Sequence, residues 1–95
     1  MSIVAIVKIV AKQGQWSRAL EVVEGSRALC LELEECSEFL VFQSQSDKHK
    51  FSFLERWSSI EMHKAFLKKL MSNKEFEESM AVFTSTPNIE YFNDR

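Results

Sequence analysis

The stretch "SIVAIVKIVA", residues 2–11, decides the fold because it is apolar on both faces of a strand. Successive side chains of a strand point to opposite sides of its sheet, so alternation separates the two faces. Lys8 is the only charged residue on either face. The faces carry Ile3, Ala5, Val7 and Ile9 on one side, and Val4, Ile6, Lys8 and Val10 on the other. Such a strand is expected at the centre of a sheet that is covered on both sides.

The next segments predict a helix and a hairpin. After a turn at Gly14, apolar residues recur at nearly helical spacing from residue 15 to about residue 31. They are Trp16, Leu20, Val23 and Cys30. Residues 37–46 contain the strand-forming run "FLVFQ", the polar "SDKHK" reverses the chain, and residues 50–57 form the next strand.

The second half of the chain contains two predicted helix starts. Ser58 precedes Glu61 by three residues, and Ser72 precedes Glu75 by three. This spacing predicts a capping box, in which the serine oxygen accepts from a backbone amide and the glutamate reaches back. The first helix would bury Ile60, His63, Phe66, Leu67 and Leu70, and the second would bury Phe76, Met80 and Phe83. Pro87 would end the second helix.

A last short strand, "IEYFN" at residues 89–93, completes the order β-α-β-β-α-α-β. This order predicts one α+β domain over residues 1–95, a ferredoxin-like split βαβ fold with a four-stranded antiparallel sheet. Helices would cover one face of the sheet, and a chain of 95 residues has no other element for the second face. We therefore expect the second face to pack on another copy, giving a homodimer that forms a dimeric α/β barrel.

Composition excludes several classes of function. The net charge is −2 and lysines alternate with glutamates, so we expect no nucleic-acid partner. The longest apolar run has five residues, far from the roughly 20 that a membrane helix needs. Without a basic leader before a hydrophobic segment, a cytoplasmic location is expected. Cys30 and Cys36 have the spacing of neither a metal pair nor a redox motif, and we assign them no chemistry.

Two runs resemble a known family. "FLERWSSIEMHKAFLKKL", residues 53–70, and "FTSTPNIEYF", residues 83–92, are similar to the antibiotic biosynthesis monooxygenase domains, which are dimeric α/β barrels. The shared pattern is a strand ending in Glu-x-Trp, a Ser-x-Glu helix start, a helical face with histidine or an aromatic residue at positions 63 and 66, and a final I-x-Y-F strand. The resemblance implies a reaction without a cofactor or metal, in which a phenol or quinol is deprotonated and its anion reacts with O₂ to give a quinone.

The chain departs from the family in three places. The polyketide-oxidising members carry an asparagine where Phe53 stands here, and an arginine on the later helix, whereas no arginine occurs between Arg56 and Arg95. The haem-cleaving members need a histidine that residues 72–86 lack, so haem cleavage is not expected. The similarity is also weak over residues 25–38, where members often carry a Gly-Cys pair and a tyrosine. Here the run "EECSEF", residues 34–39, has Cys36 and Phe39 but no glycine.

Alternation along "FSFLERW", residues 51–57, assigns its side chains to two surfaces. Phe53, Glu55 and Trp57 would face the helices and line a pocket for a small aromatic molecule, with Phe66 opposite Trp57 to hold the ring. Leu54 and Arg56 would face the partner subunit, where a guanidinium commonly holds a carboxylate. Trp57 could equally be a core anchor with no role in binding.

The candidate catalytic residues are His63 and Glu55. His63 has the kind of side chain whose pKa suits removal of a phenolic proton near pH 7, although a histidine on an apolar helix face is often only a buried structural residue. Glu55 could act as a base, orient His63 or form a plain ion pair. A carboxylate beneath apolar side chains should have a raised pKa unless it is paired.

Three functions stay open at this point. The first is a cofactor-independent monooxygenase acting on a small phenolic or quinol-type metabolite. The second is a non-catalytic binding or structural dimer, whose pocket would be below roughly 300 Å³. In that case the phenylalanines would fill it, namely Phe51, Phe53, Phe66, Phe76 and Phe83. The third is an isomerase of a small carbonyl metabolite, which oxygen uptake would distinguish from the first.

Overall fold

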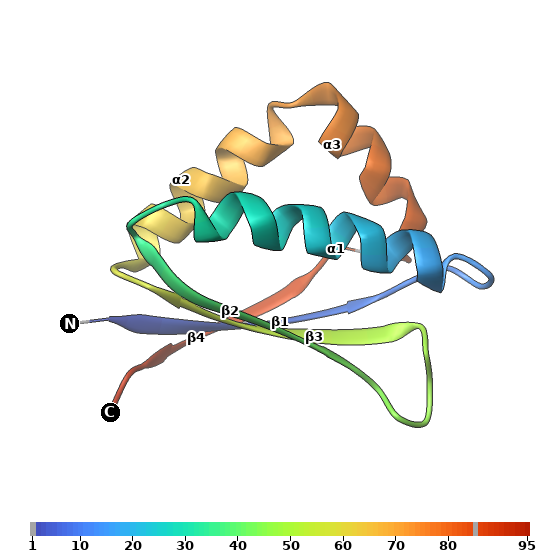
Figure 1. The fold of residues 1–95 in the computed structure, drawn as a ribbon, viewed down its shortest axis with the longest axis horizontal. Coiled ribbons are helices and arrows are strands. Elements are labelled where there is room, and N and C mark those ends of the chain that lie inside the picture. The colour runs from blue at the N-terminus through green and yellow to red at the C-terminus, as the bar shows by residue number, and fades with distance from the viewer. Residues whose placement is uncertain (1, 85) are drawn as a thin grey trace.

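The computed structural model describes residues 2–84 and 86–95 (Figure 1). Its elements are β1 (Ile3–Val10), α1 (Trp16–Leu31), β2 (Cys36–Gln43), β3 (Lys50–Trp57), α2 (Ile60–Met71), α3 (Lys74–Ser79), the 3₁₀ turn η1 (Met80–Val82) and β4 (Asn88–Asn93). The order is the one expected of a split βαβ domain, so the predicted ferredoxin-like α+β fold is confirmed.

The four strands form one antiparallel sheet in the order β2-β3-β1-β4. The doubly apolar β1 is an interior strand, as its pattern predicts. All three helices lie on one side of this sheet (Figure 1). The register places Ala5 of β1 opposite Glu55 of β3 on one side and opposite Tyr91 of β4 on the other. Glu55 and Tyr91 therefore lie in one row across the sheet, two strands apart.

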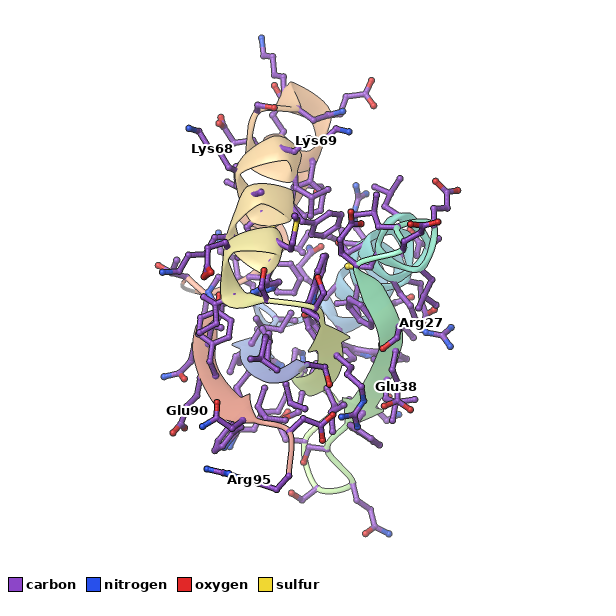
Figure 2. The ribbon with its side chains drawn as sticks, turned by 90° about the vertical axis from the view of Figure 1, so that its left-hand side faces the viewer. Arg27, Glu38, Lys68, Lys69, Glu90 and Arg95 are labelled. Atoms are coloured by element: carbon purple, nitrogen blue, oxygen red, sulfur yellow. The ribbon has the colours of Figure 1, made fainter. Side chains whose placement is uncertain are left out.

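Burial along β3 follows the predicted alternation. Phe51, Phe53, Glu55 and Trp57 are buried on the helix side, and the residues between them are only half-buried. The core therefore lies between the sheet and the helices, with α1 lying along the sheet (Figure 1). In contrast, α2 rises away from the sheet, with Lys68 and Lys69 near its far end (Figure 2).

The first predicted capping box is wrong by one residue. The cap of α2 is Ser59, which has extended backbone angles and whose Oγ accepts from the amide of Met62 at 3.2 Å. The amide of Ser58 donates to the carbonyl of Glu35 at 2.9 Å, which ties Ser58 to the loop before β2 and leaves Ser59 as the residue directly before the helix. With Ser59 as the cap, the third helical residue is Met62, and Glu61 is not in the position that reaches back.

The second capping box is also wrong, and for a related reason. Ser72 still has helical backbone angles at the end of α2, and its hydroxyl donates to the carbonyl of Lys69 at 2.7 Å. Asn73 takes the cap of α3 instead, accepting from the amide of Phe76 at 3.1 Å. The helix ends at Ser79, so Phe83 is buried from an extended segment that bridges to Ala11 and not from the helix.

The outer face of the sheet has no helix over it (Figure 1) and carries both apolar and charged side chains. Phe42 is 53% exposed and Phe92 is 45% exposed, and both lie on this side of their strands. Arg56 lies on the same face, where its guanidinium contacts Glu38 at 3.3 Å and also pairs with Asp94 of its own chain. Its predicted role at a subunit interface stays a prediction.

Over the two described ranges, no helix has the length and apolar character needed to cross a membrane.

Candidate functional site

Three elements bring a buried acid and its neighbours together above the sheet. Glu55 is only 4% exposed, and its Oε1 accepts from Nε1 of Trp57 at 3.0 Å. The Sγ of Cys30, on α1, lies 3.8 Å from the same oxygen, and Nε2 of His63, on α2, lies 3.5 Å from it. All three contacts fall on Oε1. Within the described part of the chain no hydrogen bond falls on Oε2, which leaves that oxygen for a ligand.

His63 is fully buried, and its two ring nitrogens have different surroundings. Nδ1 shares a 2.7 Å hydrogen bond with the hydroxyl of Tyr91, on β4. Nε2 faces Glu55 but has no hydrogen-bond partner among the described residues. The imidazole therefore lies between an acid and a phenol, joined firmly to the phenol only.

Trp57 contacts both titratable residues of the site and also Phe66. Its ring lies 5.2 Å from the ring of His63 and 5.3 Å from that of Phe66, measured between centroids. It is 1% exposed, and its indole N–H holds the carboxyl of Glu55. Aromatic pairs at such distances add to the energy of burial, so Trp57 fixes the positions of both its neighbours.

Burial shifts the pKa values of the acid and the imidazole in opposite directions. It raises the pKa of Glu55 to about 7, although hydrogen bonds from Trp57 and Cys30 partly oppose the shift. The prediction of a raised pKa for this carboxyl is confirmed. Burial also lowers the pKa of His63 to about 4, so the expectation of a near-neutral pKa for this residue is wrong. Desolvation penalises the charged form of each group, which makes Glu55 the one that titrates near neutral pH.

A cavity of about 420 Å³ lies between the helices and the sheet. Glu55 and His63 reach it, and its walls are otherwise mostly apolar, including Phe53, Phe66, Phe76 and Phe83. The volume exceeds the roughly 300 Å³ below which a ligand pocket is not expected. The phenylalanines thus line a space and do not fill it, which favours a binding site over a solid core.

Trp57 does not line this cavity. It lies on a neighbouring groove of about 760 Å³ between α1 and the α2–α3 pair. The groove and the cavity adjoin, because five residues line both: Val22, Ser26, Phe66, Leu70 and Phe76. A ring held between Trp57 and Phe66 would therefore lie in the groove and not in the space that Glu55 reaches. We take the smaller cavity as the site because both buried titratable groups, Glu55 and His63, reach it.

The opposed shifts predict how stability depends on pH. Between about pH 4.5 and 6.5, folded Glu55 keeps a proton that the unfolded chain has released, and unfolded His63 holds a proton that the folded chain has released. The two linkages cancel in the wild type. With Glu55→Gln only His63 remains, so stability should rise with pH relative to the wild type. With His63→Gln it should fall, each slope being at most about 1.4 kcal/mol per pH unit. Urea unfolding at several pH values measures both slopes, and slopes of the same sign would contradict the assignment.

Sequence analysis missed two members of the site. Tyr91 lies within the run "NIEYFN". Alternation along this strand predicts which side of the sheet Tyr91 faces, but it does not predict which residue Tyr91 contacts. Its place beside His63 depends on β4 pairing with β1 in the register that sets Tyr91 opposite Ala5. Cys30 is expected from the sequence to have no chemistry, and only the packing of α1 over β3 brings its thiol to Glu55. Burial raises the pKa of Cys30, so the thiol stays protonated and acts as a donor.

Comparison with known proteins was made by sequence and by structure. The sequence matches no protein-family model, and no curated protein matches it significantly. The "Putative antibiotic biosynthesis monooxygenase" of Nitrosomonas europaea has a TM-score of 0.84 at 15% identity over 98% of this chain and 89% of that chain.

Two further structures with the same description, from Bordetella bronchiseptica and Chloroflexus aurantiacus, are also similar. Each has a TM-score of 0.75, with identities of 16% and 19%. The first covers 99% of this chain and 97% of its own, and the second covers 100% and 94%. The expected likeness to this family is thus confirmed in the fold. At such identities the likeness shows the fold alone, so the reaction must be argued from the site.

Proposed function

We propose that this protein is a monooxygenase that oxidises a small phenolic or quinol-type metabolite with O₂ and without a cofactor. The observation that carries the proposal is a carboxyl group with a pKa of about 7 at an apolar cavity of about 420 Å³. An acid tuned to neutral pH is suited to accept a proton from a weakly acidic substrate. A ring-shaped apolar substrate suits the aromatic walls at Phe53 and Phe66.

The reaction begins with a proton transfer to Glu55. Ionised Glu55 accepts the phenolic proton at Oε2, while Trp57 holds Oε1 in place. The phenolate gives one electron to O₂, and the two radicals combine to form a carbon–oxygen bond. A proton from water converts the resulting peroxide anion into a hydroperoxide. The hydroperoxide loses water and becomes the quinone, so one oxygen atom enters the product and the other leaves as water. The substrate itself supplies the electrons that reduce O₂.

The assignment of roles differs from the sequence-based expectation. His63 was the expected base, with Glu55 as its helper. The structure favours Glu55 as the base because its pKa lies near 7 and its Oε2 has no protein partner among the described residues. His63 is then a neutral imidazole behind the acid, and both residues keep a proposed catalytic role.

The proposal is tested by oxygen consumption with a panel of phenols and quinols, compared with enzyme-free controls. We expect at least one compound to be consumed with one O₂ per quinone formed. A compound that is converted anaerobically would instead indicate an isomerase that uses the same carboxyl as its base. Binding without any conversion would indicate the non-catalytic alternative, and either outcome would overturn the monooxygenase.

We also propose that the protein is a homodimer joined through the outer face of the sheet. Phe42 and Phe92 on that face are 53% and 45% exposed, and packing on a second sheet would cover them. A cytoplasmic location is part of the proposal and agrees with the free thiols of Cys30 and Cys36.

Leu54→Glu should convert the dimer into a monomer. Leu54 pairs with Leu40 and Ile6 on the outer face, so a carboxylate there would be buried without a partner in the interface. The control is Leu29→Glu, an equally large change at an exposed position of α1 on the helix side. Sedimentation should give twice the chain mass for the wild type and the control. A monomeric wild type at micromolar concentration would contradict the proposal.

A further inference from the structure

We infer that His63 and Tyr91 form a relay that carries the substrate's proton from Glu55 to the open edge of the sheet. The inference rests on the proposed function, because it assigns Glu55 the role of base. It assigns proton transfer to Tyr91, a residue that does not line the cavity and to which the sequence motif gives no role.

The three side chains are arranged in series. Oε1 of Glu55 lies 3.5 Å from Nε2 of His63, and Nδ1 of the same ring lies 2.7 Å from the hydroxyl of Tyr91. Each residue comes from a different element, β3, α2 and β4. The imidazole thus bridges acid and phenol with one nitrogen toward each.

Nε2 of His63 has no hydrogen-bond partner among the described residues, and a purely structural role for His63 does not explain this. A fully buried polar atom without a hydrogen bond lowers stability, so folded proteins rarely retain one. Here Nε2 faces the carboxyl group of Glu55, which in the proposed reaction is protonated and deprotonated in each turnover. An imidazole that accepts a proton from this acid during turnover must keep that lone pair free in the resting state. Such contacts are often long in the absence of substrate and shorten in the reacting complex.

The other neighbours of Glu55 cannot take its proton. The thiol of Cys30 and the indole of Trp57 are both donors to Oε1. Burial raises the pKa of Cys30 and of Cys36, which keeps both thiols protonated. Glu55 is only 4% exposed, so a substrate that fills the cavity would block its direct path to water. His63 is therefore the one acceptor in contact with the acid among the described residues.

Tyr91 provides the exit. It is partly exposed on an edge strand of the sheet, whereas Glu55 and His63 are buried. Burial and the nearby charge of Glu55 raise the pKa of this phenol, which keeps it protonated and able to exchange a proton.

The relay moves one proton to water and leaves His63 and Tyr91 neutral, while Glu55 becomes an ionised carboxylate again. After Glu55 has accepted the substrate proton, rotation of the carboxyl brings its O–H to Nε2. The O–H bond of Glu55 breaks as N–H forms at Nε2, the N–H at Nδ1 breaks as its proton passes to the oxygen of Tyr91, and the original hydroxyl proton of Tyr91 leaves to water. Protonation of Glu55 removes the charge that strengthened its bond to Trp57, which makes the rotation easier.

The resting tautomer of His63 tests the relay without any substrate. The relay requires the proton on Nδ1, donated to Tyr91, and a bare Nε2 toward Glu55. Nitrogen-15 NMR of the wild type at pH 7 should show this form. In Tyr91→Phe, which keeps the ring and removes only the hydroxyl, the proton should move to Nε2, where Glu55 can accept it. A wild type already protonated at Nε2, or a tautomer unaffected by Tyr91→Phe, would overturn the relay.

A kinetic measurement completes the test once a substrate is known. Tyr91→Phe should lower kcat about tenfold with little change in KM, because loss of one relay member costs less than loss of the base. The solvent deuterium isotope effect on kcat should increase, since proton release becomes slower. An unchanged kcat with the tautomer shift present would also overturn the relay. If no compound is oxidised, the proposed function fails, and the NMR result still decides whether the relay geometry exists.

Discussion

Glu55→Gln should lower the rate of substrate oxidation about 10²–10⁴-fold, the usual contribution of a general base. The amide has the same shape as the carboxyl, and its oxygen can still accept the indole N–H of Trp57. It cannot accept a proton at physiological pH, so the chemistry fails while the cavity keeps its form. KM should change much less than kcat. Oxygen uptake with the identified substrate measures both.

The pH dependence of the reaction should identify the same residue. Because the pKa of Glu55 lies at about 7, activity in the wild type should rise with pH through this value as the carboxyl ionises. Glu61→Gln, on the exposed surface of α2, is the matched control and should keep both rate and profile. A Glu55→Gln variant with the wild-type rate would show that the proton is taken by another group.

Trp57→Ala should lower the free energy of unfolding by about 3–5 kcal/mol, the range for truncating a buried aromatic residue. The change removes a 1% exposed ring that contacts the rings of His63 and Phe66. It also removes the hydrogen bond to Oε1 of Glu55 that partly opposes the burial shift, so the pKa of that carboxyl should rise further. Urea unfolding followed by circular dichroism gives the stability change.

The chain's other tryptophan provides the control. Trp16 is half-exposed at the start of α1, with the ammonium of Lys48 5.3 Å from its ring centre. This cation–π contact contributes about 0.5–1 kcal/mol, and the ring is only partly buried where it packs against the core. Trp16→Ala should therefore cost clearly less than Trp57→Ala. Equal losses at the two positions would contradict the view that Trp57 anchors the core of the site.

The fold could be predicted because its signals are local and agree with one another. The doubly apolar β1, the hairpin and the element order each limit the topology, and the sheet has the expected interior strand. Alternation placed Glu55 and Trp57 on the helix side of β3 without any knowledge of the neighbours. The capping positions were wrong because two residues compete at each helix start. Which of them caps depends on the backbone before the helix, as the amide of Ser58 shows.

The site could be predicted only in part because its chemistry depends on contacts distant in sequence. The raised pKa of Glu55 followed from burial beneath apolar side chains, which the pattern contains. The low pKa of His63 depends on complete desolvation, and the place of Tyr91 depends on a register between strands that are far apart in the chain. That Trp57 lines the groove and not the cavity depends on side-chain packing, which no periodicity specifies.

The most direct test of the central claim is a pH titration of Glu55 by carbon-13 NMR of its side-chain carboxyl carbon. Assignment follows from the signal that disappears in Glu55→Gln. The account predicts a midpoint near pH 7, well above the ordinary value of 4.5, because the carboxyl is buried at the cavity. A midpoint at or below 4.5 would mean that Glu55 is already ionised throughout the neutral range as an ordinary carboxylate, and it would contradict the assignment of this residue as the base.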